Sequence, residues 1–237
     1  MTKPDPSAQP PGEEAALEKI LSSLFPPGAV VVVAIPKMYA DSLAESERAG
    51  TERMVESRLR EYTAGRVCAR HALTILGTPV GGIARGPDRL PLWPAGAVGS
   101  ITHCAGLCVV VVARASDCGA IGIDAEPATR LDPDLRDSVC RAAERDHFGT
   151  LPPLPGTDWP KVAFSIKESF YKAWFPATRL PLDFTEVELT IDPIARTVEF
   201  SVLRDDDHAE WGARALGRFE IVGDHLVTGV TIPGKMV

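Results

Sequence analysis

Residues 164–172 read FSIKESFYK, and the segment GIDAEP, which contains Asp124 and Glu126, stands about forty residues before them. Side chains alternate along a strand, so Asp124 and Glu126 point to the same side if GIDAEP is extended. Glu168 and Lys172 are four residues apart and share one face if FSIKESFYK is a helix. The two segments predict a strand and a helix on which three carboxylates and one ammonium group can converge. Such an arrangement suits a divalent cation and a phosphorylated substrate.

Each segment also has an ordinary interpretation. Short D-x-E and K-E-x-x-x-K strings are common on solvated surfaces, where Glu168 and Lys172 would form an i,i+4 ion pair worth a few tenths of a kcal/mol. Spacing alone favours this surface pair over a catalytic role. A functional assignment therefore depends on the order of the segments and on the sequence around them.

Composition bounds the class of protein. The chain has 237 residues, enough for one large domain or two small ones. Its net charge of −7 argues against a general nucleic-acid binder, whose binding surface is basic. Its apolar runs are too short to span a bilayer, and its first residues lack the apolar core of a signal peptide. Five cysteines without a C-x-x-C pair are typical of reduced thiols. We therefore expect a cytoplasmic protein that binds neither nucleic acid nor membrane.

Hydrophobic periodicity predicts mixed helices and strands, and so a fold of the α/β (α+β) class. Helices are expected over 13–25, 51–76, 130–149 and 161–175, and strands over 29–35, 98–103, 107–114, 119–125, 186–191, 197–203, 214–222 and 226–232. Pro176 is expected to end the helix 161–175. Residues 1–12 are rich in proline and polar side chains and are expected to be disordered.

Three arginines, Arg58, Arg66 and Arg70, are spaced by eight and four residues and lie on one side of the predicted helix 51–76. A solvated face, with nearby glutamates as partners, is the commoner meaning of such spacing. A phosphate-binding face is the alternative, since guanidinium groups match phosphate oxygens in geometry. His103 stands at a predicted strand end, where folds present functional groups, although a lone histidine is more often structural.

Four blocks of sequence follow one another in a characteristic order. They are REYTAGRVCAR (60–70), WPAGAVGSITHCAG (93–106), AIGIDAEP (120–127) and FSIKESFYKAWFP (164–176). The combination of T-H before G-I-D-x-E with K-E-S-x-x-K after it is specific. By these blocks the chain resembles the phosphopantetheinyl transferases of the monomeric surfactin- and enterobactin-synthetase type, over roughly residues 55–185.

The resemblance implies a fold of two similar α/β halves, related by a pseudo-twofold axis, with the site between them. The turn-like SDCGA then divides the chain into a half that grips coenzyme A phosphates, 13–118, and a half with the metal site and catalytic helix, 119–237. The implied enzyme is a monomer. It transfers 4′-phosphopantetheine from coenzyme A to a serine of an apo acyl or peptidyl carrier protein, requires Mg²⁺, and releases adenosine 3′,5′-bisphosphate.

The family's functional positions carry over residue by residue. Coenzyme A contacts are implied for Arg58, Arg66, Arg85, Gly86, Pro87, Asp88, Thr102, His103, Asp124, Glu168, Lys172 and Leu182. Metal ligands are implied at Asp124, Ala125, Glu126 and Glu168, and catalytic roles at Glu168 and Lys172. Glu168 is expected to be the general base, a metal ligand or both, and Lys172 to neutralise a phosphate oxygen or assist the leaving group. The roles of Arg60 and Arg70 stay open.

Two other functions compete with this one. A binding module of the same fold that has lost catalysis would be expected to lose its carboxylates and lysine first. A different Mg²⁺-dependent phosphotransferase would be expected to carry a G-x-x-x-x-G-K-[ST] loop or a kinase motif set, which this sequence lacks. Carrier proteins are acidic, as this chain is, so docking would use a local patch. Lys161, Lys167 and Arg179 are the candidates for that patch.

Overall fold

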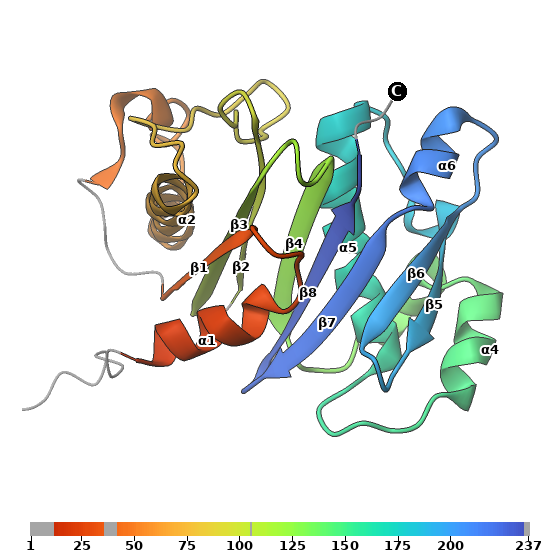
Figure 1. The fold of residues 1–237 in the computed structure, drawn as a ribbon. Coiled ribbons are helices and arrows are strands. Elements are labelled where there is room, and N and C mark those ends of the chain that lie inside the picture. Colours follow the sequence, from red (N-terminus) through yellow and green to blue (C-terminus); the bar gives the residue numbers. More distant parts are fainter. Residues whose placement is uncertain (1–11, 36–41, 105, 235–237) are drawn as a thin grey trace, which may run out of the picture.

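The computed structural model describes residues 12–35, 42–104 and 106–234, and its strands form two antiparallel sheets (Figure 1). The first sheet has the order β1-β3-β2 and consists of β1 (Val30–Ala34), β2 (Ala97–Cys104) and β3 (Leu107–Arg114). The second has the order β4-β8-β7-β6-β5 and consists of β4 (Ala120–Pro127), β5 (Val187–Asp192), β6 (Thr197–Val202), β7 (Leu216–Val222) and β8 (His225–Ile232). The chain completes one sheet before it enters the other. The predicted α+β class is confirmed.

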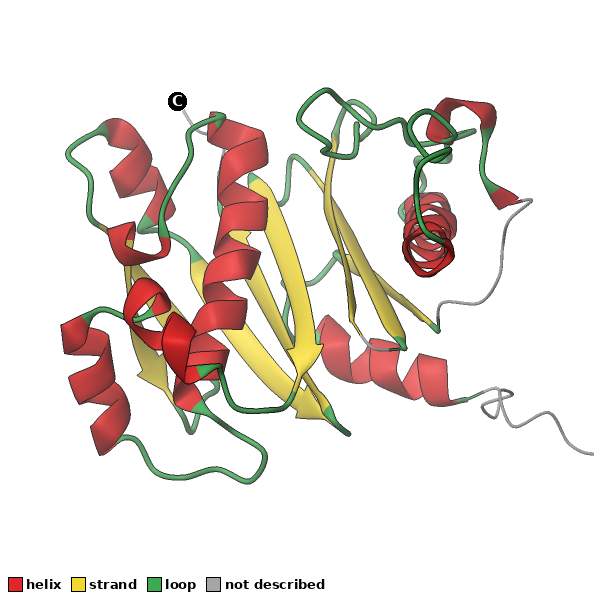
Figure 2. Cartoon of the chain, turned by 180° about the vertical axis from the view of Figure 1, so that it is seen from behind, coloured by secondary structure: helices red, strands yellow, loops and turns green. Residues whose placement is uncertain are grey.

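The outer faces of the two sheets are covered by helices, whereas the first helix, α1 (Glu13–Ser22), packs into the layer between the sheets. The other helices are α2 (Glu56–Ile75), α3 (Arg136–Val139), α4 (Ala142–Thr150), α5 (Trp159–Thr178) and α6 (Asp207–Gly212), with short 3-10 turns η2 (Glu45–Glu47), η3 (Pro133–Leu135) and η4 (Phe184–Glu186). In Figure 2, α5 crosses the second sheet, while α2 lies beside the first. Among the described helices, none combines the length and the apolar character that a bilayer crossing needs.

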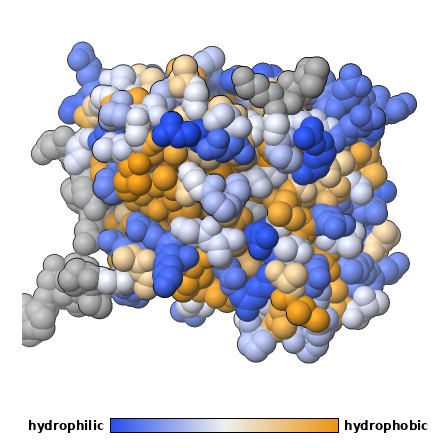
Figure 3. All heavy atoms as spheres, in the orientation of Figure 1, coloured by the Kyte–Doolittle hydropathy of each residue, from blue (hydrophilic) through white to orange (hydrophobic). Residues whose placement is uncertain are grey.

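The middle strand of the first sheet shows why the two sheets pack together. β3 is apolar on both faces because both are covered. Val110 and Val112 belong to the core under α2, whereas Val109 and Val111 belong to a second core. That second core also holds residues of α1, β4 and β8. The sheets therefore share one buried layer. On the face shown in Figure 3, hydrophobic side chains occur in separate clusters among hydrophilic ones, as on most folded domains.

Side chains along β4 alternate between the core shared by the two sheets and the opposite face, which carries polar groups and faces α5. Ile121 and Ile123 belong to the layer between the sheets. Gly122 and Asp124 point the other way, toward α5. The predicted common direction of Asp124 and Glu126 is confirmed, since both contact side chains of α5.

Gly122 lets β4 and α5 approach closely. A Cβ atom at Gly122 would lie 1.9 Å from the backbone carbonyl oxygen of Ser169 and 2.9 Å from the amide nitrogen of Ala173. Backbone atoms cannot move aside as a side chain can, so only glycine fits at this position. The contact fixes the height of α5 above the strand that carries Asp124.

The facing edges of the two sheets, β2 and β4, are joined by side-chain hydroxyls. The amide of Ile123 donates to Ser100 Oγ at 3.2 Å, and the amide of Ala125 donates to Thr102 Oγ1 at 3.1 Å. All of these residues are buried or nearly so. These bonds lock the two halves of the chain together next to Asp124.

Several predicted boundaries differ from the observed ones, for identifiable reasons. The helix predicted over 51–76 begins only at Glu56, because Val55 before it is extended. The pattern over 130–149 is broken where Cys140 and Arg141 are extended, and Glu144 caps a new helix by accepting from the Arg141 amide.

Pro176 was expected to end its helix. It lies instead inside α5, which continues to Thr178. In the last turn a proline removes a single intrahelical hydrogen bond, and the helix stops where Arg179 adopts a left-handed conformation, φ 60°. The first eleven residues of the predicted tail 1–12 lie outside the described residues. The pseudo-twofold relation and the boundary between 118 and 119 stay predictions.

We expect Gly122→Ala to lower the free energy of unfolding by about 1–3 kcal/mol, the usual cost of overpacking a core. Gly149→Ala is the matched control. Gly149 lies in α4 and is exposed, and a Cβ atom at this position would have no neighbour within 4 Å. This change is therefore expected to be neutral or to stabilise by about 0.5–1 kcal/mol. Urea unfolding of both variants is the measurement. Equal stabilities would contradict the close contact between β4 and α5.

Candidate active site

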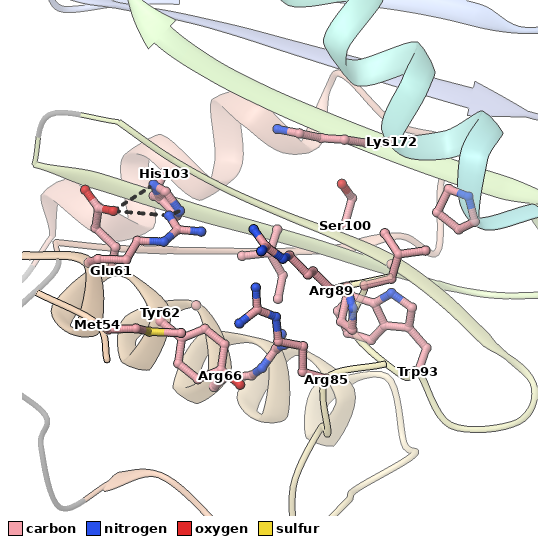
Figure 4. A pocket seen from close by; sticks show the side chains of 17 residues that line it. Met54, Glu61, Tyr62, Arg66, Arg85, Arg89, Trp93, Ser100, His103 and Lys172 are labelled. Carbon is pink, nitrogen blue, oxygen red and sulfur yellow. Dashed lines mark hydrogen bonds and ion pairs between the residues drawn. The ribbon is translucent and has the colours of Figure 1, made fainter. Parts of the chain in front are cut away.

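A cationic cavity of about 330 Å³ lies between α2, β2 and the C-terminal part of α5. Five cationic side chains line it against one carboxylate: Arg58, Arg66, Arg85, Arg89 and Lys172 against Glu61. Figure 4 shows Arg66, Arg85 and Arg89 brought together between α2 and the loop that follows it. Such a concentration of positive charge is suited to a polyanionic ligand.

Arg66 is the most buried of these cations, with 4% of its surface exposed. Its guanidinium lies 4.7 Å from the centroid of the Tyr62 ring. Its Nε atom is buried and has no hydrogen-bond partner among the described residues. Buried polar groups in folded proteins are almost always bonded, so a donor without an acceptor among the described residues makes Arg66 a candidate for ligand binding.

Arg85 and Arg89 reach the cavity from a hairpin over residues 84–92. The Gly86 amide donates to the Leu90 carbonyl at 2.8 Å, and the Leu92 amide to the Ala84 carbonyl at 2.9 Å. Arg89 has φ 64°, a left-handed conformation that the tight turn imposes. The turn thereby directs two guanidinium groups into one cavity.

The tip of this hairpin is tied to the other half of the chain. Asp88 Oδ2 accepts from Arg179 Nη1 at 2.8 Å, at the end of α5. Gly86, Pro87 and Asp88, for which coenzyme A contacts were predicted, form this tip and are absent from the lining of the cavity. Their role as ligand contacts stays a prediction.

His103 lies at the entrance of the cavity between Arg58 and Glu61. A guanidinium can only donate, so Nε2 of His103 accepts from Arg58 and the ring proton lies on Nδ1, 3.4 Å from Glu61. Burial lowers the pKa of His103, with Arg58 and Lys172 adding to the effect and Glu61 opposing it. His103 is therefore neutral near pH 7, and its proton faces Glu61.

The two arginines left open from sequence do not line the cavity. Arg60 is exposed and lies 4.0 Å from Glu56. Arg70 pairs with Glu47, a fully buried carboxylate that also accepts from the amides of Ala44 and Ile83. Arg70 therefore has a structural role.

Asp124 is a buried carboxylate at the meeting point of both halves. Its Oδ1 accepts from Lys172 Nζ at 2.7 Å and from Thr102 Oγ1 at 3.3 Å. Its Oδ2 accepts from Ser165 Oγ at 2.8 Å. Thr102 is absent from the lining of the cavity and donates to Asp124, and its predicted contact with coenzyme A stays a prediction.

Glu126 follows on the same face of β4 and accepts from Lys161 Nζ at 2.5 Å. The side chain of Ala125 belongs to the core on the opposite face, so only its backbone carbonyl is available to a metal. Lys161 was a candidate for carrier docking. In the structure its side chain is mostly buried and paired with Glu126.

Glu168 opens into a second cavity of about 290 Å³, whose walls include Tyr171, Leu182 and Phe184. Burial raises the pKa of Glu168, the carboxylates of Asp124 and Glu126 add to the rise, and Lys172 opposes it. The three carboxylates are thus close enough to influence one another. A carboxylate with a raised pKa is a better proton acceptor than a free one.

The carboxylates fit a hard cation in their chemistry, although they are not gathered around one point. Among the described residues, no group of three or more His, Cys, Asp or Glu side chains is placed to hold a metal ion. Asp124 and Glu126 instead face the ammonium groups of Lys172 and Lys161. Carboxylate oxygens are the ligands that Mg²⁺ prefers. The site has the right donors, and two of them are paired with lysines.

Tyr62, Arg89 and Trp93 are among the lining residues of the first cavity that were not assigned a role from sequence. Arg89 stands four residues after Arg85, but only the hairpin brings the two together. Tyr62 is four residues before Arg66, a helical spacing that could have revealed the stacking of the two side chains. The position of Trp93 depends on tertiary structure, since its ring packs against Gly99.

Lys167, from the same motif as Glu168, is not available for docking, contrary to the sequence-based expectation. Its ammonium is buried and donates to Glu144 Oε2 at 2.8 Å and to the carbonyls of Val139 and Phe184 at 2.9 Å. Glu144 in turn accepts from the Leu189 amide at 3.0 Å. This pair ties α5 to α3, α4, η4 and β5.

Comparison with known proteins identifies the family of the chain. Residues 46–113 match the family model of the 4′-phosphopantetheinyl transferase N-terminal domain, and residues 120–228 match that of the 4′-phosphopantetheinyl transferase superfamily. The chain is 42% identical to the 4′-phosphopantetheinyl transferase Svp of Streptomyces mobaraensis over 182 residues, which cover 75% of this chain and 74% of Svp. It is 34% identical to the 4′-phosphopantetheinyl transferase PptT of Mycobacterium tuberculosis over 212 residues, 87% of each chain. It is 41% identical to enterobactin synthase component D of Salmonella typhi over 132 residues, 52% of this chain and 51% of that protein.

A two-sheet α+β fold with a cationic cavity beside the carboxylates of Asp124, Glu126 and Glu168 is suited to a phosphorylated substrate. The chain belongs to the 4′-phosphopantetheinyl transferase superfamily. Its reaction is the transfer of 4′-phosphopantetheine from coenzyme A to a carrier protein. The family predicted from the sequence is confirmed.

We expect Lys167→Met to lower the free energy of unfolding by about 3–5 kcal/mol, because it leaves the Glu144 carboxylate buried without its counter-charge. Lys172→Met is the matched control on the same helix. Its side chain is 29% exposed, against 2% for Lys167, and it lines a cavity, so solvent can take the place of the lost ammonium beside Asp124 and the cost in stability is expected to be smaller. Urea unfolding at pH 7 measures both. A Lys167→Met protein as stable as Lys172→Met would contradict the structural role of Lys167.

Proposed function

We propose that the cationic cavity binds the phosphates of coenzyme A and that the carboxylates beside it hold Mg²⁺ during transfer to a carrier serine. The observation that carries this proposal is Arg66, a buried guanidinium with an unpartnered Nε in a cavity lined by three further arginines. Coenzyme A carries a 3′-phosphate and a diphosphate. A phosphate oxygen would supply the acceptor that Arg66 lacks and would offset the charge of its neighbours.

Lys172 connects the two parts of the site. Its side chain lines the cationic cavity while its ammonium contacts Asp124. The diphosphate therefore lies near Lys172 when the nucleotide end occupies the cavity. Lys172 then neutralises a phosphate oxygen and stabilises the charge that develops on the departing phosphate.

The metal ligands are proposed to be Asp124, Glu126 and Glu168, with the backbone carbonyl of Ala125 in support. Without a cation these carboxylates would repel an anionic diphosphate. Mg²⁺ would screen that repulsion and polarise the phosphoryl group. Lys161 and Lys172 would exchange carboxylate partners for phosphate or water oxygens as the cation enters.

Glu168 is proposed as the general base. It accepts the proton of the carrier serine hydroxyl while the serine oxygen attacks the phosphorus that bears the pantetheine arm. The bond between that phosphorus and the oxygen bridging to the nucleotide breaks, and adenosine 3′,5′-bisphosphate leaves. In the metal-free chain, burial and the neighbouring carboxylates raise the pKa of Glu168, which favours proton acceptance and supports this role.

The second cavity is proposed to hold the pantetheine arm, which agrees with the coenzyme A contact predicted for Leu182. Its walls are largely apolar, with Leu182 and Phe184 opposite Tyr171, and Glu168 stands at one side. An arm in this cavity places the adjoining phosphate near the carboxylates.

The working form is proposed to be a cytoplasmic monomer that binds neither nucleic acid nor membrane. Both halves of one chain supply the lining of the cationic cavity, so no second copy is needed to complete it. Sedimentation of the protein with and without coenzyme A tests the oligomeric state.

Arg66→Ala is expected to weaken coenzyme A binding by roughly 1.5–3 kcal/mol, the value of one charged hydrogen bond. If Arg66 contacts the 3′-phosphate, the affinity for dephospho-coenzyme A should fall much less. Titration calorimetry with both ligands is the measurement, and Arg60→Ala, an exposed arginine on the same helix, is the control. Equal losses of affinity for the two ligands would indicate that Arg66 contacts the diphosphate and not the 3′-phosphate. Unchanged affinities for both would overturn the assignment of the cavity as a phosphate site.

Glu168→Gln is expected to reduce single-turnover transfer by about 10²–10⁴ while changing coenzyme A affinity little, because glutamine cannot accept the serine proton. A Mg²⁺ series separates the two roles of Glu168. Partial recovery of transfer at high Mg²⁺ would indicate that Glu168 is a metal ligand. No recovery would indicate that it is the general base. Transfer is followed by the mass gain of an apo carrier protein. Wild-type turnover in this variant would remove Glu168 from the reaction, and no transfer by the wild-type chain to any carrier in a panel would favour a binding module.

A further inference from the structure

Three buried hydroxyl groups stand directly behind the Asp124 carboxylate. Ser165 and Ser169 lie one turn apart on α5, and Thr228 lies on β8. Thr228 is directly opposite Asp124 in the pairing of β4 with β8. All three hydroxyl residues have no exposed surface. None of them was assigned a function from the sequence.

These hydroxyls form a continuous chain that ends on the carboxylate. Ser169 Oγ lies 2.7 Å from Thr228 Oγ1, and Thr228 Oγ1 lies 3.0 Å from Ser165 Oγ. Ser165 Oγ donates to Asp124 Oδ2 at 2.8 Å. Two backbone carbonyls are alternative acceptors for these hydroxyls: the Ser165 carbonyl lies 2.9 Å from Thr228 Oγ1, and the Thr228 carbonyl lies 3.0 Å from Ser169 Oγ.

The chemistry of the carboxylate gives this chain a direction. A carboxylate paired with an ammonium acts as an acceptor, so the single proton of Ser165 points at Asp124. The Ser165 oxygen is then free to accept from Thr228, whose single proton has the Ser165 carbonyl as its other acceptor. Ser169 has the same choice between Thr228 Oγ1 and the Thr228 carbonyl. When Thr228 donates to Ser165, the two bonds point toward Asp124 and strengthen each other in the low-dielectric interior.

The two oxygens of Asp124 consequently have different surroundings. Oδ2 is turned inward and is held by Ser165. Oδ1 contacts Lys172, whose side chain lines the cationic cavity. Rotation of the carboxylate would break the contact with Ser165 and leave a buried oxygen without a donor, which is costly.

We propose that Ser165, supported by Thr228, is the positioning residue that fixes the Asp124 carboxylate and so presents Oδ1 to the divalent cation. This inference rests on the proposed function, which makes Asp124 a metal ligand. Bonds to the non-ligating oxygen of a carboxylate set its orientation and raise metal affinity, as outer hydrogen bonds do at metal sites generally.

Ser169 allows a matched test. Ser165→Ala and Ser169→Ala remove the same atom from equally buried positions on one helix, yet only Ser165 touches Asp124. A purely structural role would give the two variants the same properties. Thr228→Val removes a hydroxyl at nearly constant volume and interrupts the chain one step further from the carboxylate.

The experiment measures Mn²⁺ binding by electron paramagnetic resonance at saturating coenzyme A. Coenzyme A affinity in the presence of a metal chelator and thermal unfolding are measured for the same variants. We expect Ser165→Ala to raise the Mn²⁺ dissociation constant by about 10- to 100-fold, the usual effect of losing an outer hydrogen bond at a metal site. Ser169→Ala is expected to raise it far less, and Thr228→Val by an intermediate amount. Coenzyme A affinity in chelator is expected to stay as in the wild type for all three.

Asp124→Asn separates failure of this inference from failure of the proposed function. Wild-type Mn²⁺ affinity in Asp124→Asn would remove the metal site itself. Loss of Mn²⁺ in Asp124→Asn, with equal affinities for Ser165→Ala and Ser169→Ala, would overturn the positioning role alone. Should Ser165→Ala fail to fold, the comparison of Thr228→Val with Ser169→Ala decides: equal affinities overturn the inference, and a weaker Thr228→Val supports it.

Discussion

The arrangement of the site depends on one buried carboxylate, Asp124. It lies where β2, β4 and α5 meet, and it receives a donor from each side: Thr102 from the first half of the chain, and Ser165 and Lys172 from α5. A buried charge is tolerated only when it is paired and hydrogen-bonded, so these contacts are a condition of folding as well as of function. The same requirement that satisfies Asp124 brings the cationic cavity and the acidic cluster together.

Local periodicity was sufficient to find the parts of the site that lie within single elements. Alternation along β4 placed Asp124 and Glu126 on one face of the strand, and helical spacing placed Glu168 and Lys172 on one face of α5, because both periods are properties of the backbone alone. The α+β class followed from the same patterns. The family assignment needed more, namely the order of four motifs along the chain.

What sequence could not show depends on contacts between distant residues. Arg70 lies four residues after Arg66 on the same helix, and this spacing does not show that Arg70 pairs with the buried Glu47. The sequence around Lys167 likewise does not show that its partner, Glu144, is buried. The joint entry of Arg85 and Arg89 into the cavity comes from a hairpin. In each case the partner lies 20 residues or more away in the sequence, or on a turn whose conformation the hydrophobic pattern does not specify. Sequence periodicity therefore cannot predict these contacts.

The hydroxyl bonds between β2 and β4 have a consequence for the exposed edges of the two sheets. Each of these strands is the last in its sheet, and a last strand exposes amides and carbonyls that can pair with another molecule. Here Ser100 and Thr102 occupy the outward amides of Ile123 and Ala125. The edge strands β2 and β4 face each other and are bridged by these side chains. Neither sheet can therefore add a strand from another molecule at this edge.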